Sequence, residues 1–240
     1  MNYFILRNSL VLKKIGVHPQ CQTMSEGYDR SASNSIWKLL DQPIDFIPNL
    51  NSFKLEHKAK LTDLISTVNL GSTVIMGNLL ISKDKETIFK NFNLAPHQTF
   101  EADLIAQKKH YPYFVFHFLG NQNECIDYKK SVFFIGDQFG FKIEDVAINS
   151  YEEYLNLFSQ LETEHKETDS NRKTIRAAQI FLNKSKINFD FFRLRHIVDH
   201  FVVSEKLKDE LLANNFTGAD FINFEEIKIK VHPAAPKDIA

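Results

Sequence analysis

Aromatic side chains two residues apart recur along the chain, and this spacing predicts a core built on a β-sheet. Phenylalanines follow it at Phe114, Phe116 and Phe118. Aromatic residues with this period suit pleated strands that bury at least one face. The segment Tyr113–Leu119 is apolar on both alternations, so we expect it to form a central strand that is covered on both faces.

Further strands are predicted where short apolar runs are bounded by turn residues. The five residues Gly136–Gly140 separate two such runs and have the length and the glycines of a hairpin loop. Asn183–Lys186 is expected to be the turn between two later strands. The remaining predicted strands are Asn2–Leu6, Leu79–Ile81, Phe100–Ile105, Ser131–Ile135, Phe141–Ile148, Ile175–Leu182, Phe189–Leu194, Phe201–Val203 and Ile227–Val231.

Helical periodicity is clearest between Tyr151 and about Glu164, where apolar residues recur at helical spacing. Ser150 and Glu153 have the spacing of a capping box, in which each side chain hydrogen-bonds a free backbone N–H group at the start of a helix. The almost wholly polar segment Thr163–Lys173 that follows is predicted to be an exposed, mobile loop, and a domain boundary could fall there.

Two shorter helices are predicted from a shared local pattern, in which an apolar triplet is followed by a serine and a charged turn. Ser82 stands before Asp84–Asn91, and Ser204 stands before Lys206–Asn214. Each serine is expected to be the N-cap of its helix. The second helix is expected to bury three leucines: Leu207, Leu211 and Leu212.

These elements predict an α+β fold with a largely antiparallel sheet, a few short helices and two similar strand-Ser-helix-strand units. We expect residues 1–77 to form an irregular N-terminal segment with one short strand. Residues 78–168 and 169–232 would then form a first and a second α+β unit, and residues 233–240 a loose tail. A single domain that includes all of these parts is the alternative.

Charge and composition narrow the class of partner. Lys and Arg (29) nearly balance Asp and Glu (30), so no overall field favours nucleic acid or an anionic membrane surface. No apolar run approaches the roughly 18 residues that a membrane helix requires, and Arg7 and Asn8 interrupt the apolar N-terminus. Cys21 and Cys125 form neither a CxxC motif nor a Cys/His array and indicate reduced thiols in a cytoplasmic protein.

The familiar catalytic motifs are absent from the sequence. Neither phosphate-binding loop motif, GxxxxGK[ST] or GxGxxG, occurs, and neither does the GxSxG elbow of serine hydrolases. His117 lies eight residues before Cys125, but nothing nearby would lower the pKa of the thiol, so we expect a packed side chain there. We therefore expect no enzymatic activity, no cofactor and no catalytic or metal-binding residues.

The densest group of chemically active side chains is Arg193, Arg195, His196, Asp199 and His200. In a helix, both histidines would share one face and could hold zinc with the aspartate as an oxygen ligand. However, the residues just before this group alternate as in a strand, which would scatter the ligands. The alternative is an exposed polar strand end or turn.

Acidic and basic clusters are short. Glu162 and Glu164 resemble the glutamate pair of ADP-ribosyl transfer, although acidic pairs at the end of a charged helix are usually a solvated face. The clusters Lys108–His110 and Lys129–Lys130 are too short to indicate nucleic-acid binding.

Several segments, taken together, resemble a family of bacterial immunity proteins associated with polymorphic toxin and contact-dependent or type VI secretion systems. The resemblance covers most of the chain and lies in order and spacing. The segments are Ser31–Leu39, Ile47–Leu50, Ala59–Ser66, Leu80–Ser82, Phe92–His97, Ile126–Phe133, Phe191–Leu194 and Val203–Lys208.

The resemblance implies a cytoplasmic antitoxin that binds a cognate protein toxin domain and blocks its active site or its assembly. Complementary charge speeds such encounters, and the only dense acidic stretch contains four candidate partner-binding residues: Glu162, Glu164, Glu167 and Asp169. The alternative is a metal-assisted hydrolase or a nucleotide-processing enzyme that uses His196, Asp199 and His200.

Overall fold

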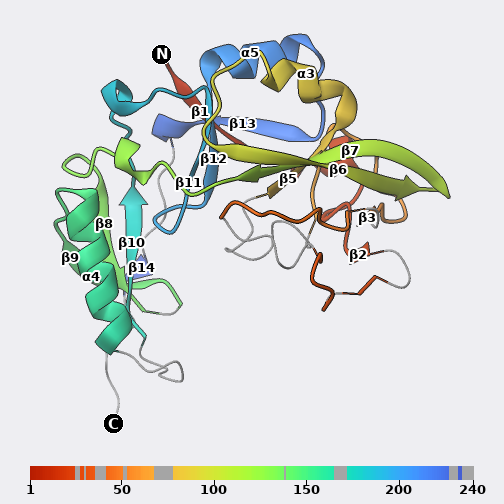
Figure 1. Cartoon of the computed structure of the whole chain (residues 1–240). Coiled ribbons are helices and arrows are strands. Elements are labelled where there is room, and N and C mark those ends of the chain that lie inside the picture. Colours follow the sequence, from red (N-terminus) through yellow and green to blue (C-terminus); the bar gives the residue numbers. More distant parts are fainter. Residues whose placement is uncertain are drawn as a thin grey trace. The chain divides into compact units, whose positions relative to one another are not determined.

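The structure is a computed structural model that describes residues 1–24, 28–29, 31–35, 42–50, 53–67, 78–137, 139–164, 172–226 and 232–233. It shows an α+β fold of mostly antiparallel strands with short helices, as the sequence predicts. The chain forms two compact units (Figure 1). Unit 1 contains Met1–Gln122 and Phe189–Ile222, and unit 2 contains Asn123–Asn188 and Asn223–Ala240.

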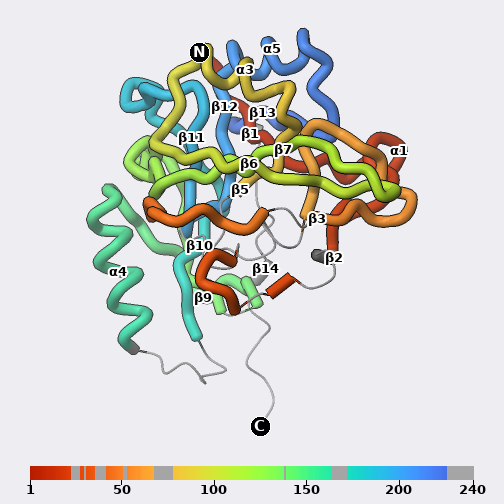
Figure 2. Tube along the Cα trace, turned by 45° about the vertical axis from the view of Figure 1, so that its right-hand side comes forward, coloured from red at the N-terminus to blue at the C-terminus, as the bar shows by residue number. Residues whose placement is uncertain are grey.

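This division differs from the expected one, in which units follow one another at residues 78–168 and 169–232. The reason is the antiparallel pairing of β1 (Tyr3–Asn8) with β12 (His200–Ser204), which joins Tyr3 to Ser204 in register. Figure 2 shows these strands from opposite ends of the sequence lying together. Segments distant in the sequence therefore share unit 1.

A six-stranded sheet of unit 1 contains the predicted central strand. Its order is β2-β3-β6-β7-β5-β4, and β7 pairs with β6 on one side and β5 on the other. Tyr113–Phe118 is buried throughout, which confirms the prediction of a strand covered on both faces. The bounds are β2 Thr23–Met24, β3 Phe53–Lys54, β4 Leu64–Ile65, β5 Asn78–Ser82, β6 His97–Ala106 and β7 Lys109–Phe118.

The second sheet of unit 1 has the order β11-β12-β1-β13. Short helices α3 and α5 contact each other, and α5 also packs on β12 and β1 (Figure 1). Four phenylalanine rings contact one another in the core of unit 1: Phe89, Phe116, Phe118 and Phe191. The bounds are α1 Leu12–Ile15, 3-10 turn η2 Lys83–Lys85, α3 Glu86–Phe89, β11 Phe191–Leu194, α5 Glu205–Ala213 and β13 Ala219–Asn223.

Unit 2 is a sheet of order β10-β8-β9-β14 with one long helix. Figure 1 shows α4 lying along this sheet, where it contacts β10. The antiparallel β8–β9 pair and helix α4, Tyr151–Glu164, are as the sequence predicts. The bounds are η3 Asn123–Cys125, β8 Val132–Gly136, β9 Phe141–Val146, β10 Thr174–Gln179, η4 Lys184–Lys186, η5 Phe224–Glu226 and β14 His232–Pro233.

The turn predicted at Asn183–Lys186 is confirmed: it lies between β10 and β11 and is closed by a hydrogen bond from the Lys186 N–H to the Asn183 carbonyl at 3.0 Å, although these two strands pair with β8 and β12 and not with each other. Two other local predictions are wrong. Leu212 is 52% exposed, because only Leu207 and Leu211 on α5 face the core. Ser82 makes no side-chain cap; its hydroxyl donates instead to the Asp84 carboxylate.

Other predictions fall outside the described residues. They are the strand predicted at Ile227–Val231 and most of the loop predicted at Thr163–Lys173. The N-terminal 77 residues contain more strands than expected, because β2, β3 and β4 join the edges of the six-stranded sheet.

Candidate interaction surface

The Asp137 side chain and two backbone hydrogen bonds link the residues of the turn between β8 and β9. Asp137 Oδ1 accepts hydrogen bonds from the backbone N–H groups of Phe139 and Phe141, each at 2.9 Å. The Asp137 N–H donates to the Phe141 carbonyl at 3.0 Å, and the Gly140 N–H donates to the Asp137 carbonyl at 3.1 Å. One aspartate therefore fixes both sides of the turn.

A glycine and an arginine complete this turn. Gly140 has φ +91°, a left-handed conformation that side chains other than glycine adopt at a cost in strain. The Arg176 guanidinium lies over Gly140, 3.5 Å from where a Cβ atom would be, and its Nη2 donates to the Asp137 carbonyl at 3.3 Å. These contacts join Asp137, Gly140 and Arg176 within unit 2.

Three described residues of this turn and of β9 expose apolar side chains. Phe139 is 77% exposed, Phe141 39% and Ile143 44%. These residues alternate with Gly140 and Lys142 along the chain. We call the described residues Asp137 and Phe139–Ile143 the hairpin end of unit 2. Exposed aromatic side chains on a fixed backbone are typical anchors of protein–protein interfaces.

Charged side chains next to the hairpin end pair with one another. Lys142 Nζ lies 2.6 Å from Asp145 Oδ2. Arg172 Nη2 lies 2.6 Å from Glu162 Oε1 in the last turns of α4. Since Thr174, which begins β10, is in register with Gly136, this second ion pair lies at the same end of the unit 2 sheet.

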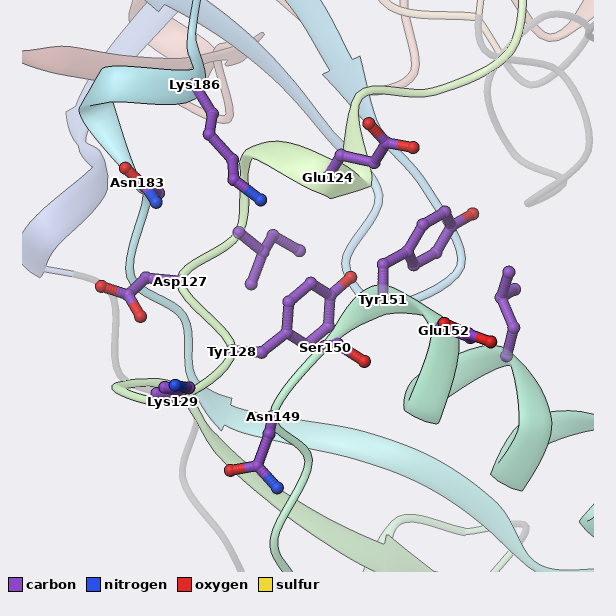
Figure 3. A pocket seen from close by; sticks show the side chains of 12 residues that line it. Glu124, Asp127, Tyr128, Lys129, Asn149, Ser150, Tyr151, Glu152, Asn183 and Lys186 are labelled. Carbon is purple, nitrogen blue, oxygen red and sulfur yellow. The ribbon is translucent and has the colours of Figure 1, made fainter.

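A cleft of about 660 Å³ lies at the other end of α4 (Figure 3). The rings of Tyr128 and Tyr151 in its wall are stacked 6.3 Å apart at 25°. Figure 3 shows the Lys186 side chain extending into the cleft. The residues that line it are Glu124, Ile126, Asp127, Tyr128, Lys129, Asn149, Ser150, Tyr151, Glu152, Leu155, Asn183 and Lys186.

The lining of this cleft does not select one ligand chemistry. It carries both signs of charge, with Glu124 and Glu152 against Lys129 and Lys186. The Tyr128 hydroxyl already donates to the Asn123 carbonyl at 3.1 Å, and burial raises the pKa of this phenol. These groups would suit a polar segment of a partner protein as well as they would suit a small molecule.

The acidic stretch predicted to bind a partner is only partly described. Glu162 is paired with Arg172, which offsets its charge. The backbone of Glu164 ends α4. Glu167 and Asp169 lie outside the described residues. The role of these four residues in binding therefore stays a prediction.

The histidines of the candidate metal group do not share a helix face. His196 lies in a turn with φ +68°, closed by a hydrogen bond from the Ile197 N–H to the Arg195 carbonyl at 2.9 Å. His200 begins β12. Asp199 Oδ1 accepts from Arg193 Nε at 3.0 Å and Nη2 at 2.8 Å.

The positive charges of Arg193 and Arg195 beside His196 disfavour a bound cation at this turn, whereas a lowered histidine pKa by itself does not. Burial and the positive charges of Arg195 and Arg193 lower the pKa of His196, with Asp199 acting in the opposite direction. Burial also lowers the pKa of His200. Across the described ranges, no three His, Cys, Asp or Glu side chains are grouped so that they could hold a metal ion.

The two cysteines are buried free thiols. Burial raises the pKa of Cys21 and of Cys125 to about 11 in each case. Both thiols are therefore protonated, and hence weakly nucleophilic, near neutral pH.

The hairpin end is a candidate interaction surface that the sequence did not indicate. Its Gly136–Gly140 segment was identified only as a loop, although Asp137 followed by Gly140 is a signal for a turn fixed by an aspartate side chain. Sequence alone does not reveal that the Phe139 side chain is exposed.

No protein-family model matches the chain, and no curated protein matches it. No helix in the described part of the chain is long and apolar enough to cross a membrane.

Proposed function

We propose that this chain is an immunity protein that acts in the bacterial cytoplasm by binding a cognate toxin domain and occluding it. The single observation that carries the proposal is the presentation of Phe139 on a turn that Asp137 already holds in place. The resemblance of the sequence to bacterial immunity proteins supports the same function.

The energetics of such a contact are favourable. Burying an exposed phenylalanine side chain stabilises a complex by roughly 1.5–3 kcal/mol. An ordered turn adds to this, because binding then loses less conformational entropy than with a flexible loop. A few anchors of this kind usually dominate the binding free energy of an interface. Occlusion of a toxin requires no chemistry from the chain that binds it.

Co-expression with a toxin-domain protein encoded by a gene next to that of this chain, if one is found there, tests the proposal. The wild-type chain should restore growth, and Phe139→Ala should weaken toxin binding by at least about 30-fold, the equivalent of a hot spot of about 2 kcal/mol. Ile47→Ala is the matched control, because Ile47 is an apolar side chain that is 87% exposed in unit 1. The control should bind as the wild type does.

A wild-type chain that neither binds the toxin nor restores growth would contradict the proposed function. His196→Ala should retain growth rescue, because occlusion makes no use of an imidazole at that position. Loss of rescue by a folded His196→Ala protein that still binds the toxin would favour the hydrolase instead.

A further inference from the structure

We infer that a pocket in unit 1 binds a small aromatic molecule that carries an N–H donor, and that His97 accepts the hydrogen bond from this donor. The pocket has a volume of about 250 Å³ and lies between α3, the segment that follows it, and the β6–β7 pair. It belongs to unit 1, whereas the hairpin end belongs to unit 2. The inference therefore goes beyond the proposed function and does not depend on it.

The β6–β7 pair forms the floor of this pocket. Thr99 is in register with Phe116, and Glu101 is in register with Phe114. Residues opposite each other in an antiparallel pair project from the same face of the sheet. Phe114 and Phe116 are each 1% exposed, whereas Thr99 is exposed. The floor thus consists of buried aromatic rings on β7 and an accessible hydroxyl group on β6.

The walls of the pocket are also aromatic. The ring of Phe89, from α3, lies 6.4 Å from the Phe114 ring and 6.0 Å from the Phe116 ring. Half-buried Phe92 and Leu94 line the pocket from the segment after α3. Such walls favour a flat ring, which can stack on one phenyl group and meet the edge of another. The volume limits the ligand to one or two rings, because pockets for drug-sized ligands measure roughly 300–1,000 Å³.

The His97 ring supplies a hydrogen-bond acceptor to the pocket that it lines. It is stacked on the Phe116 ring, with centroids 4.6 Å apart and an angle of 14° between the planes. Nδ1 is 2.9 Å from the Ala95 carbonyl oxygen, which can only accept, so Nδ1 carries the hydrogen. In the neutral ring, Nε2 then has a lone pair and can accept. An N–H group on the ligand complements this nitrogen.

Charged side chains beside the pocket favour a ligand that is contained within it. Glu86 and Lys90, which line the pocket, form an ion pair of 3.4 Å. Lys83 Nζ lies 2.9 Å from Glu86 Oε2 and 3.4 Å from Glu101 Oε1. The side chains of Lys90 and Glu101 are 65% and 88% exposed. A small molecule leaves these ion pairs in water, whereas a protein partner would have to cover and dehydrate them.

The experiment titrates indole into the full chain, labelled with ¹⁵N, and follows the backbone amide signals by NMR. The largest shifts should occur at residues that line the pocket, among them Phe92, Leu94 and Thr99, with a dissociation constant below about 1 mM. Benzofuran has the same shape but an oxygen atom in place of the N–H group, so it should bind about three- to tenfold more weakly. Absence of these shifts with indole, or equal binding of the two compounds, would overturn the inference.

His97→Phe tests the acceptor. A phenyl ring can still stack on Phe116 but cannot accept a hydrogen bond, so indole and benzofuran should bind this variant equally. Thermal unfolding shows whether the variant is folded, and if it is not, the comparison of the two compounds on the wild type decides. A folded variant that still prefers indole would overturn the role of His97.

Thr99→Phe tests the place of binding. The added ring should fill the pocket from β6 and weaken indole binding by at least about tenfold, because a filled pocket has no space for the ligand. Thr87→Phe is the matched control, since Thr87 is an exposed threonine on α3 that does not line the pocket. The control should bind indole as the wild type does, and equal binding by both variants would overturn the site.

A tryptophan-containing peptide separates a small molecule from a protein partner. Shifts at the pocket with this peptide and none with indole would assign the pocket to a partner side chain and overturn the inference. These titrations contain no toxin, so their failure leaves the proposed function in place.

Discussion

His117 lies within the central strand with both ring nitrogens against oxygen atoms. Nδ1 is 2.6 Å from Asn78 Oδ1, and Nε2 is 3.2 Å from the Gln42 carbonyl. Burial lowers the pKa of His117, which favours a neutral ring with only one N–H donor. Asn78 Nδ2 is buried and, within the described part of the chain, has no hydrogen-bond partner. Turning the Asn78 amide would place this nitrogen as a donor to Nδ1 and satisfy both contacts.

The lowered pKa of His117 makes stability depend on pH. The unfolded chain binds this proton near the ordinary value of 6.5, whereas the folded chain resists it. The free energy of unfolding should therefore fall as pH decreases below about 6.5, by at most about 1.4 kcal/mol per pH unit for each such histidine. Urea unfolding at several pH values measures this decline.

The control for this prediction is His117→Gln, which removes the titrating ring. Its decline between pH 6.5 and about 5 should be shallower, although His196 and His200, whose pKa values are also lowered, still contribute. Equal declines in the two proteins would show that His117 does not contribute.

At the scale of elements, two serines in the same sequence pattern have different roles. Ser204 is fully buried, accepts from the Leu207 N–H at 3.3 Å and donates to Asp190 Oδ1 at 2.7 Å. Ser82 precedes only the short turn η2, and its hydroxyl bonds the Asp84 carboxylate, which lowers the pKa of that group. Of these two serines, only Ser204 therefore caps a helix.

Alanine substitution should separate these serines. Ser204→Ala should lower the free energy of unfolding by about 1–2 kcal/mol, because a helix N–H loses its cap and the Asp190 carboxylate loses a donor. Ser82→Ala should cost less than about 0.5 kcal/mol, as for most surface substitutions. Denaturant midpoints measure both, and equal losses would contradict the difference in capping.

The start of α4 shows a modified capping box. Ser150 Oγ accepts from the Glu153 N–H at 3.1 Å, as the sequence predicts. The Glu153 carboxylate, however, accepts from the N–H of Asn149 at 2.7 Å, one residue before the cap. The start of α4 is thus held by two reciprocal hydrogen bonds, one accepted by the Ser150 side chain and one accepted by the Glu153 side chain.

At the scale of the whole molecule, three segments that are distant in the sequence are joined by hydrogen bonds in unit 1. We call this contact, made by Ser9, Asp63–Leu64 and Thr217–Gly218, the seam. Asp63 Oδ2 accepts from the Thr217 N–H at 2.7 Å, and the Leu64 N–H donates to the Thr217 carbonyl at 3.0 Å. Gly218 lies in this seam with φ +81°, and its carbonyl accepts from the Ser9 N–H at 2.8 Å. Three separate parts of the sequence meet there.

Gly218→Ala should open this seam. A Cβ atom would lie 2.2 Å from the Leu64 carbonyl oxygen, which is backbone and cannot move aside easily. Strain and overlap together should cost roughly 2–4 kcal/mol. Gly120→Ala is the matched control, because Gly120 has φ +71° but no heavy atom within 4 Å of the added carbon. Thermal unfolding should show the larger loss for Gly218→Ala; similar losses would mean that the overlap is relieved.

The sequence by itself determined the features that depend on local patterns. Tyr113–Phe118 is a buried central strand because its two faces are both apolar. Helix α4 follows from helical spacing and from the cap at Ser150. The β8–β9 hairpin follows from a short loop that contains glycine. Each of these signals is contained within a few neighbouring residues.

Only the tertiary structure decided which strands pair and which side chains remain exposed. The β6–β7 hairpin turns at Gln107 and Lys108 with φ +48° and +65°, without the glycine that marks such turns in sequence. Strand β11 pairs with β12 rather than with β10, the strand that precedes it in the sequence. Pairing depends on which faces can be buried together across long distances in the chain. The exposure of Phe139 also depends on the tertiary structure, because an apolar side chain is buried only where the fold places other residues against it.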